Sequence, residues 1–125
     1  MNAKLGARLL AAGRVAYGVG LLAAPTRTAG GWLGAENVKR PSVQAVVRSV
    51  GVRDIVLGMI ALHTIGHPEI GARWQATCAV VDSVDLLGTV AARSDLPAAG
   101  VAGTAVVAGG AAVGGFYLSR ALKRA

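Results

Sequence analysis

Six charged residues interrupt stretches of this sequence that are otherwise apolar enough to cross a lipid bilayer. They are Arg14, Arg48, Arg53, Asp54, Asp82 and Asp85. A carboxylate at membrane depth can bind a proton or a cation, and it can also pair with an arginine. Because an ionised side chain at that depth costs at least about 2.5 kcal/mol, such residues face the inside of a helical bundle. We therefore expect these six side chains to form a buried ion-pair cluster between helices.

Two of the aspartates are predicted to share one face of a helix. Asp82 and Asp85 are three residues apart, and Cys78 and Thr89 extend the same face. Two carboxylates this close repel each other, and burial strengthens the repulsion unless a cation lies nearby. An arginine can supply that cation, since its guanidinium binds a carboxylate through two parallel hydrogen bonds.

The third aspartate lies between two glycines on another predicted helix. Gly51, Asp54 and Gly58 fall in one narrow stripe, because a helix turns about 100° per residue. Without side chains, the glycines allow a neighbouring helix to approach this carboxylate closely. Arg53 points away from the stripe and is expected to reach a different helix. Arg48 lies nearer the helix end, from which it can turn toward the interface.

Two roles are open for this set of charges. Three positive and three negative charges balance, which favours a structural network that holds the helices together. A path for protons or ions is the alternative, because ionisable groups inside a membrane are candidate functional groups in general. A conduction path, however, often keeps an acid without a permanent cation.

Four apolar segments are long enough to be the helices that position these residues. We expect them over residues 4–24, 43–65, 70–92 and 96–118. Each has about 20 residues, which at about 1.5 Å per residue crosses a hydrocarbon core of about 30 Å. All four prolines fall at segment boundaries, where proline is tolerated. The sequence thus predicts one all-α domain, residues 1–125, in which four transmembrane helices form a bundle with antiparallel neighbours.

The composition supports a membrane protein. Apolar residues make up 54% of the chain and charged residues 15%, and the net charge is +7. Because the six intramembrane charges cancel, the whole excess lies at helix ends and in loops, where basic residues contact anionic lipids. No nucleic-acid-binding module is visible, so we expect membrane lipids as partners and no nucleic acid. Six basic residues on the side of the termini against four on the other predict a multi-pass plasma-membrane protein with cytoplasmic termini.

Other local features are weaker signals. In the fourth segment Gly110 and Gly114 have the small-xxx-small spacing of close helix packing, which allows a homo-oligomer. The connection over residues 25–42 places Trp32 beside the first segment, at the expected membrane interface. His63 and His67 are four residues apart, but Gly66 and a proline break the helix there, so we expect no metal site.

The whole chain resembles a family of short actinobacterial integral membrane proteins that is known as a domain of unknown function. The resemblance depends on Gly34 after Trp32-Leu33, on Trp74, on Asp82-x-x-Asp85, and on the run Arg48-x-x-Gly51-x-Arg53-Asp54-x-x-x-Gly58. It implies four membrane helices and no assigned activity.

No catalytic motif or cofactor site is recognisable in the sequence, so we expect a protein that is not an enzyme. The leading hypothesis is an accessory or assembly component of a larger membrane complex, stabilised by a buried Arg–Asp network. One alternative is a small transporter or channel subunit that uses its intramembrane aspartates for a proton, an ion or a solute. Another is a lipid or quinone binder that uses grooves between helices rich in small residues.

Overall fold

The computed structural model describes residues 2–125, and this range is helical throughout apart from short connections. The five α-helices are α1 (Ala3–Ala23), α2 (Pro25–Leu33), α3 (Pro41–Thr64), α4 (Pro68–Ala91) and α5 (Ala98–Arg124). Two single 3-10 turns, η1 (Asn37–Lys39) and η2 (Arg93–Asp95), complete the connections. The all-α prediction is confirmed. The four long helices overlap the four expected segments, and α2 is an additional helix that was not predicted.

Proline positions explain where most helices begin. Pro25, Pro41 and Pro68 each occupy the first turn of a helix, and Pro97 precedes α5. Proline lacks a backbone N–H, which the first turn of a helix leaves unpaired in any case, and its fixed φ suits that turn. The chain therefore breaks into helices at the same residues that bound the apolar segments in the sequence.

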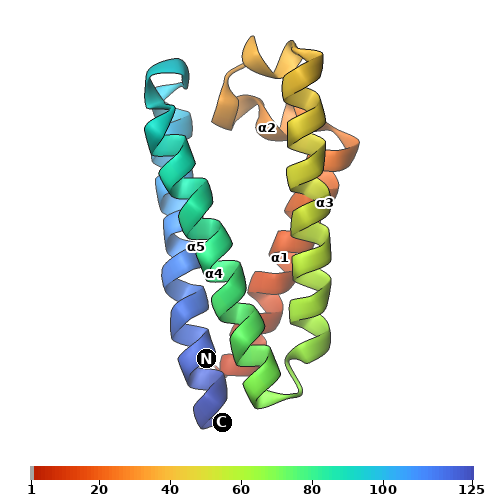
Figure 1. The fold of residues 1–125 in the computed structure, drawn as a ribbon, viewed down its shortest axis with the longest axis vertical. Helices are drawn as coiled ribbons and strands as arrows, with labels where there is room; N and C mark the ends of the chain where they lie inside the picture. Colours follow the sequence, from red (N-terminus) through yellow and green to blue (C-terminus); the bar gives the residue numbers. More distant parts are fainter. Residues whose placement is uncertain (1) are drawn as a thin grey trace.

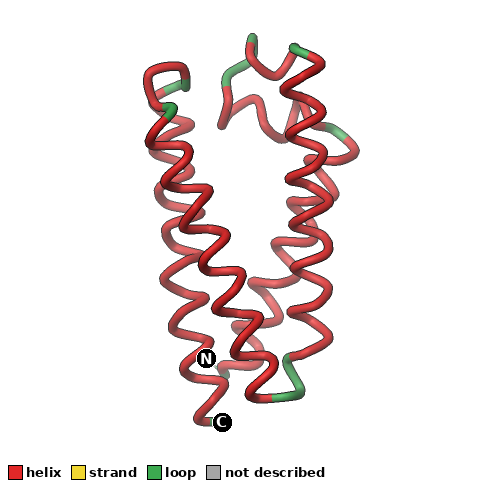
Figure 2. The backbone as a smooth tube through the Cα atoms, in the orientation of Figure 1, coloured by secondary structure: helices red, strands yellow, loops and turns green. Residues whose placement is uncertain are grey.

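The long helices are arranged as two pairs. Figure 1 shows α1 beside α3 and α4 beside α5, and these are the two extensive helix–helix contacts. Contacts between the pairs are fewer, and both chain termini lie at the end where the α3–α4 turn is found. From that end the pairs diverge toward α2. The non-helical segments lie toward the two ends of the molecule (Figure 2).

Glycines let α1 and α3 approach closely. A Cβ atom placed on Gly51 would lie 2.7 Å from the carbonyl oxygen of Gly18, and one placed on Gly58 would lie 2.9 Å from that of Ala11. Distances this short leave no room for a side chain. Gly51 and Gly58 therefore lie at a close helix contact, on the α3 face that also carries Asp54.

The glycines expected to pack the last helix do not do so. Apart from the adjacent backbone of α5 itself, no atom of residues 2–125 lies within 4 Å of a Cβ placed on Gly110 or Gly114. The packed face of α5 instead includes Gly115, whose Cβ would lie 3.0 Å from the Cβ of Ala79 on α4. Gly110 and Gly114 therefore do not pack against another helix of the same chain, because the face of α5 that meets α4 is centred on other residues. A role of these glycines in a homo-oligomer stays a prediction.

Two apolar clusters close the ends of the molecule. One, beside the termini, consists of Ala7, Ile65, Ala72, Leu118 and Leu122. The other is built by α1, α2, η1 and α3 and consists of Leu21, Ala29, Val38 and Val47. In the second, α2 ends at Gly34, whose φ of 98° is a conformation that favours glycine. Between these two clusters lie a smaller apolar cluster, formed by Ala11, Ala61 and Cys78, and several buried polar side chains.

Two helices, α1 and α5, are long and apolar enough to cross a membrane by length and composition. Both α3 and α4 have the length, with 24 residues each, but they carry most of the charges that interrupt the apolar stretches. Those charges lower the hydropathy of α3 and α4 relative to α1 and α5. Their position in the fold is described next.

Candidate functional site

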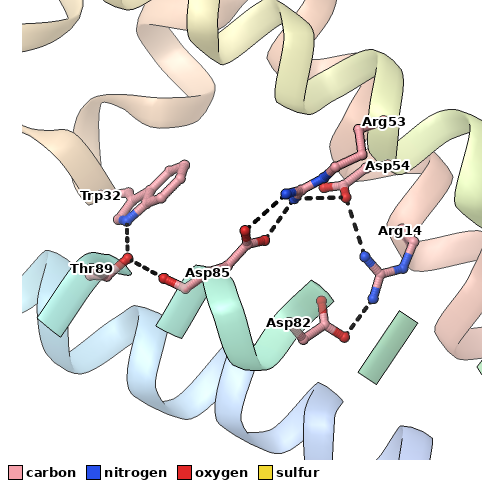
Figure 3. Close-up of polar contacts among 7 residues, drawn as sticks. All are labelled: Arg14, Trp32, Arg53, Asp54, Asp82, Asp85 and Thr89. Carbon is pink, nitrogen blue, oxygen red and sulfur yellow. Dashed lines mark hydrogen bonds and ion pairs between the residues drawn. The ribbon is translucent and has the colours of Figure 1, made fainter. Parts of the chain in front are cut away.

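Five charged side chains from three helices meet between the two helix pairs (Figure 3). Arg14 comes from α1, Arg53 and Asp54 from α3, and Asp82 and Asp85 from α4. We call these five residues the charged network. Because each lies well inside its helix rather than at an end, the network is far from both ends of the molecule.

Arg14 connects both helix pairs through its two terminal nitrogens. Its Nη1 donates to Asp54 Oδ1 over 3.2 Å, and its Nη2 donates to Asp82 Oδ2 over 2.5 Å. The exposed fractions of these side chains are 8% for Arg14, 7% for Asp54 and 10% for Asp82. Charge-assisted hydrogen bonds between groups this buried are stronger than bonds between neutral groups.

Arg53 forms the second connection between the pairs. Its Nη1 and Nη2 donate to the two oxygens of Asp85 over 2.9 and 2.7 Å, and Nη2 also donates to Asp54 Oδ1 over 3.2 Å. This is the parallel, two-bond geometry that guanidinium and carboxylate groups prefer. Arg53 and Asp85 are the more exposed part of the network, at 32% and 24%.

Arg48 is not part of the network, which corrects the prediction. It is exposed on α3, and it forms no ion pair with any residue in the range 2–125. Arg48 and Arg53 are five residues apart, so they point about 140° apart around the helix. Arg53 faces α4 and its aspartates, and Arg48 therefore projects away from them.

Without Arg48, the charges of the network do not balance. Two arginines face three aspartates, and no further cationic side chain of residues 2–125 lies within ion-pair distance of these carboxylates. With all groups ionised, the formal charge is −1. Two oxygens, Asp82 Oδ1 and Asp54 Oδ2, accept no hydrogen bond from the described residues. One added positive charge would bring the network to neutrality.

A cavity of about 810 Å³ adjoins the network. All three aspartates and Arg14 line it, together with apolar residues of α1 and α5 and with Trp32 of α2. Three glycines, Gly13, Gly103 and Gly110, lie in the lining. Apart from the adjacent backbone of their own helices, no atom of residues 2–125 lies within 4 Å of a Cβ placed on them. The space exists because small residues leave it unfilled.

A hydrogen-bonded tryptophan lines the cavity. Trp32 Nε1 donates to Thr89 Oγ1 over 3.0 Å, and Thr89 Oγ1 donates to the carbonyl oxygen of Asp85 over 2.8 Å. Figure 3 shows this chain of contacts leading to the charged network. The sequence placed Thr89 on the face of the aspartates, but it gave no sign that Trp32 would meet it. That contact depends on α2, which turns the indole inward.

The polar face of α4 extends one turn beyond the predicted face, to Gln75. Cys78 and Gln75 are buried on the same face as the aspartates. Gln75 is 2% exposed, and its Nε2 has no hydrogen-bond partner in the described chain. The signal for Gln75 was its spacing of three residues before Cys78. It continues the stripe of polar side chains toward the end where the chain termini lie.

The two histidines lie outside this site. Both are exposed beside the α3–α4 turn, and His63 Nδ1 contacts the carbonyl oxygen of Met59 over 3.2 Å. Within residues 2–125, no group of three or more His, Cys, Asp or Glu side chains has an arrangement that could hold a metal ion.

Comparison with known proteins gives no assignment. No family model, curated protein or solved structure matches the chain. The resemblance to short actinobacterial membrane proteins stays a prediction, and the case for a function depends on the charged network and the cavity.

Proposed function

We propose that the protein is an integral membrane protein in which α1, α3, α4 and α5 all span the bilayer. This proposal is supported by the distribution of side chains, because charged side chains are buried between the helices and large apolar side chains are exposed on the outside. On the outside, Val106, Val113 and Leu87 are 75%, 73% and 68% exposed, whereas the network charges are inside. Large exposed apolar surfaces mark membrane or protein contacts, and intramembrane charges face inward and pair. On this proposal α3 and α4 span despite the four network charges that they carry, because those charges form ion pairs inside the bundle. Arg48 lies about two turns from the start of α3, from which its long side chain can reach the membrane interface.

The proposed orientation places both termini in the cytoplasm of a cell whose plasma membrane contains the protein. Both termini and the α3–α4 turn lie at one end, and basic residues are more numerous there, as the positive-inside rule requires of the cytoplasmic side.

Within this membrane protein, we propose that the charged network is a binding site for one positive charge. The protein then acts as a small transport or channel subunit for a proton or a monovalent cation, and not as an enzyme. The observation that carries the proposal is the imbalance of two arginines against three aspartates beside an 810 Å³ cavity. A buried, uncompensated negative charge is unfavourable, so a bound proton or cation stabilises the site.

The geometry also suggests why binding would affect the helices. Asp82 and Asp85 belong to α4, and the arginines that hold them belong to α1 and α3. A cation at Asp82 competes with Arg14 for the same carboxylate. Loading the site therefore weakens one of the two ion pairs that join the helix pairs, and this links occupancy to their separation.

Proteoliposomes test this function. Purified protein is reconstituted with a pH-sensitive dye inside, and a potassium gradient with valinomycin supplies the driving force. We expect proton entry faster than in protein-free liposomes, and Asp82→Asn, which removes the excess charge, to abolish the difference. Arg48→Gln is the matched control and keeps the flux, because Arg48 lies outside the network. If neither protons nor monovalent cations, alkali or organic, cross faster than in empty liposomes, the proposal is wrong.

A structural role of the same network is the second candidate. The observation in its favour is that Arg14–Asp82 and Arg53–Asp85 are ion pairs between the two helix pairs. On that proposal the protein is an accessory or assembly component of a larger membrane complex or a homo-oligomer. Stable, fully folded Asp82→Asn protein that lacks flux favours transport. Equal loss of folded protein in every network variant, with no flux in the wild type, favours the structural role.

A further inference from the structure

We propose that the cavity binds an organic monocation with apolar substituents, a lipophilic ammonium or phosphonium ion. This inference specifies the ligand class of the site and rests on the proposed function. Its basis is that one cavity combines three properties: a size that suits a small organic molecule, largely apolar walls, and a place for one positive charge.

Size and polarity favour an organic ligand over a bare inorganic ion. A volume of about 810 Å³ lies within the range of pockets that bury small organic ligands. Most of its lining comes from apolar and small residues of α1 and α5, such as Leu10, Val107 and Ala111. A small hydrated ion would leave these walls without contacts, whereas apolar substituents would fill them.

The charge of the lining selects a cation. Asp82 Oδ1 and Asp54 Oδ2 have no hydrogen-bond donor in residues 2–125, and both residues line the cavity. An anion would meet an uncompensated carboxylate there. A monocation supplies the one positive charge that brings the network to neutrality, and it needs no hydrogen-bond donor to do so.

An aromatic side chain supports the same choice. Trp32 lines the cavity, and its indole is held by the hydrogen bond to Thr89. Aromatic faces attract cations, tryptophan most strongly, and the attraction grows when the cation is desolvated. A fixed indole that lines the same cavity as the carboxylates is therefore suited to a cation that has little hydration of its own.

The cavity can be reached from the lipid. Its lining includes Leu9 of α1 and Val106 of α5, which are 59% and 75% exposed. The cavity therefore reaches the outer surface between these two helices. In the proposed membrane orientation that opening faces acyl chains, in which a lipophilic cation dissolves and an inorganic ion does not.

Equilibrium dialysis with tetraphenylphosphonium tests the proposal. The protein is placed in nanodiscs of neutral phosphatidylcholine, and binding to empty nanodiscs is subtracted. We expect saturable binding of one phosphonium per chain. Tetraphenylborate has the same shape with a negative charge, and we expect no saturable binding of it. Equal binding of the two ions would overturn the proposal, because it would show partition into apolar surface.

Two kinds of variant locate the binding site. Asp82→Asn removes the excess charge, and we expect affinity for the phosphonium at least about tenfold weaker. Gly103→Leu fills the cavity and keeps every charge, and we expect it to abolish binding. The matched controls are Gly114→Leu and Gly88→Leu. A Cβ placed on Gly114 or Gly88 also has no atom within 4 Å apart from the adjacent backbone of its own helix, but neither residue lines the cavity.

Comparison of the leucine variants keeps the test decisive even if Asp82→Asn does not fold. Loss of binding in Gly103→Leu with normal binding in both controls supports the cavity as the site. The same affinity in all three variants overturns it. Asp82-dependent proton flux in a protein that binds no phosphonium would contradict this inference and leave the proposed transport function intact. Phosphonium binding without any flux would support the ligand class and contradict the proposed transport function.

Discussion

Arg53 on α3 holds Asp85 on α4 through two hydrogen bonds, of 2.9 and 2.7 Å. This contact joins the α1–α3 pair to the α4–α5 pair, and contacts between the pairs are fewer than contacts within them. The bond from Arg14 to Asp82 joins the same two pairs. These ion pairs, together with the small apolar cluster of Ala11, Ala61 and Cys78, connect the two helix pairs between the end clusters.

The first prediction concerns the free energy of unfolding. Arg14→Ala leaves Asp82 and part of Asp54 without a buried partner, and we expect a loss of about 3–5 kcal/mol. Unfolding by sodium dodecyl sulfate in mixed micelles, followed by circular dichroism, measures it. Arg48→Ala is the control, and we expect a change within about 0.5 kcal/mol because Arg48 is exposed and unpaired in the described chain. Equal effects of the two substitutions would contradict the arrangement.

The second prediction compares two glycines. Gly58→Ala places a Cβ 2.6 Å from Val15 Cγ2 and 2.9 Å from the carbonyl oxygen of Ala11, so α1 and α3 must separate. We expect a destabilisation of about 1–3 kcal/mol. Gly110→Ala adds a methyl group in open space, and its higher helix propensity is expected to stabilise by about 1 kcal/mol or less. Thermal unfolding of both variants measures the two changes in stability. A larger destabilisation by Gly110→Ala than by Gly58→Ala would show that Gly110 contacts another helix.

The third prediction concerns the indole of Trp32, which lines the cavity. Trp32→Phe removes the hydrogen bond to Thr89 and leaves the ring in place, at an expected cost of about 0.5–1.5 kcal/mol. Because the bond ties α2 to α4, amide hydrogen exchange over residues 25–33 is expected to become faster. Trp74→Phe is the matched control, since no side-chain hydrogen bond of Trp74 to the rest of residues 2–125 is lost. Unchanged exchange in Trp32→Phe would mean that packing alone holds α2.

The fourth prediction separates four membrane spans from two. Single cysteines are introduced at positions 37, 66, 95 and 120 after Cys78→Ala, and intact cells are treated with a maleimide that does not cross membranes. With four spans, positions 37 and 95 react from outside, whereas 66 and 120 react only after lysis. If α1 and α5 alone crossed the membrane, positions 37, 66 and 95 would all react from one side.

Much of this arrangement could be predicted from the sequence. Prolines and apolar segments indicated the long helices, because both features restrict where a helix can begin and how long it can be. The meeting of Arg14 and Arg53 with the aspartates followed from the cost of an isolated charge in an apolar stretch. The close approach at Asp54 followed from the flanking glycines on the same face, Gly51 and Gly58.

Other parts were not accessible to the same reasoning. The sequence predicts Arg48 in the network because three arginines would neutralise three aspartates. The direction of the Arg48 side chain, however, depends on which side of α3 meets α4. Residues 25–33 are rich in threonine and glycine, which favour helices weakly, so α2 depends on tertiary contacts of Ala29 and Trp32. The cavity follows from how the two helix pairs diverge, which no local pattern describes. Gly110 faces that space instead of a helix.

The position of Arg48 decides whether the network has an excess negative charge, and solid-state NMR in lipid bilayers measures it directly. Dipolar coupling between 15N-labelled guanidinium groups and 13C-labelled aspartate carboxyl carbons reports which pairs lie within contact distance. We predict strong coupling for Arg14 and Arg53 with Asp54, Asp82 and Asp85, and none for Arg48. Coupling of Arg48 to any of these carboxylates, or no coupling at Arg14 and Arg53, would contradict the account.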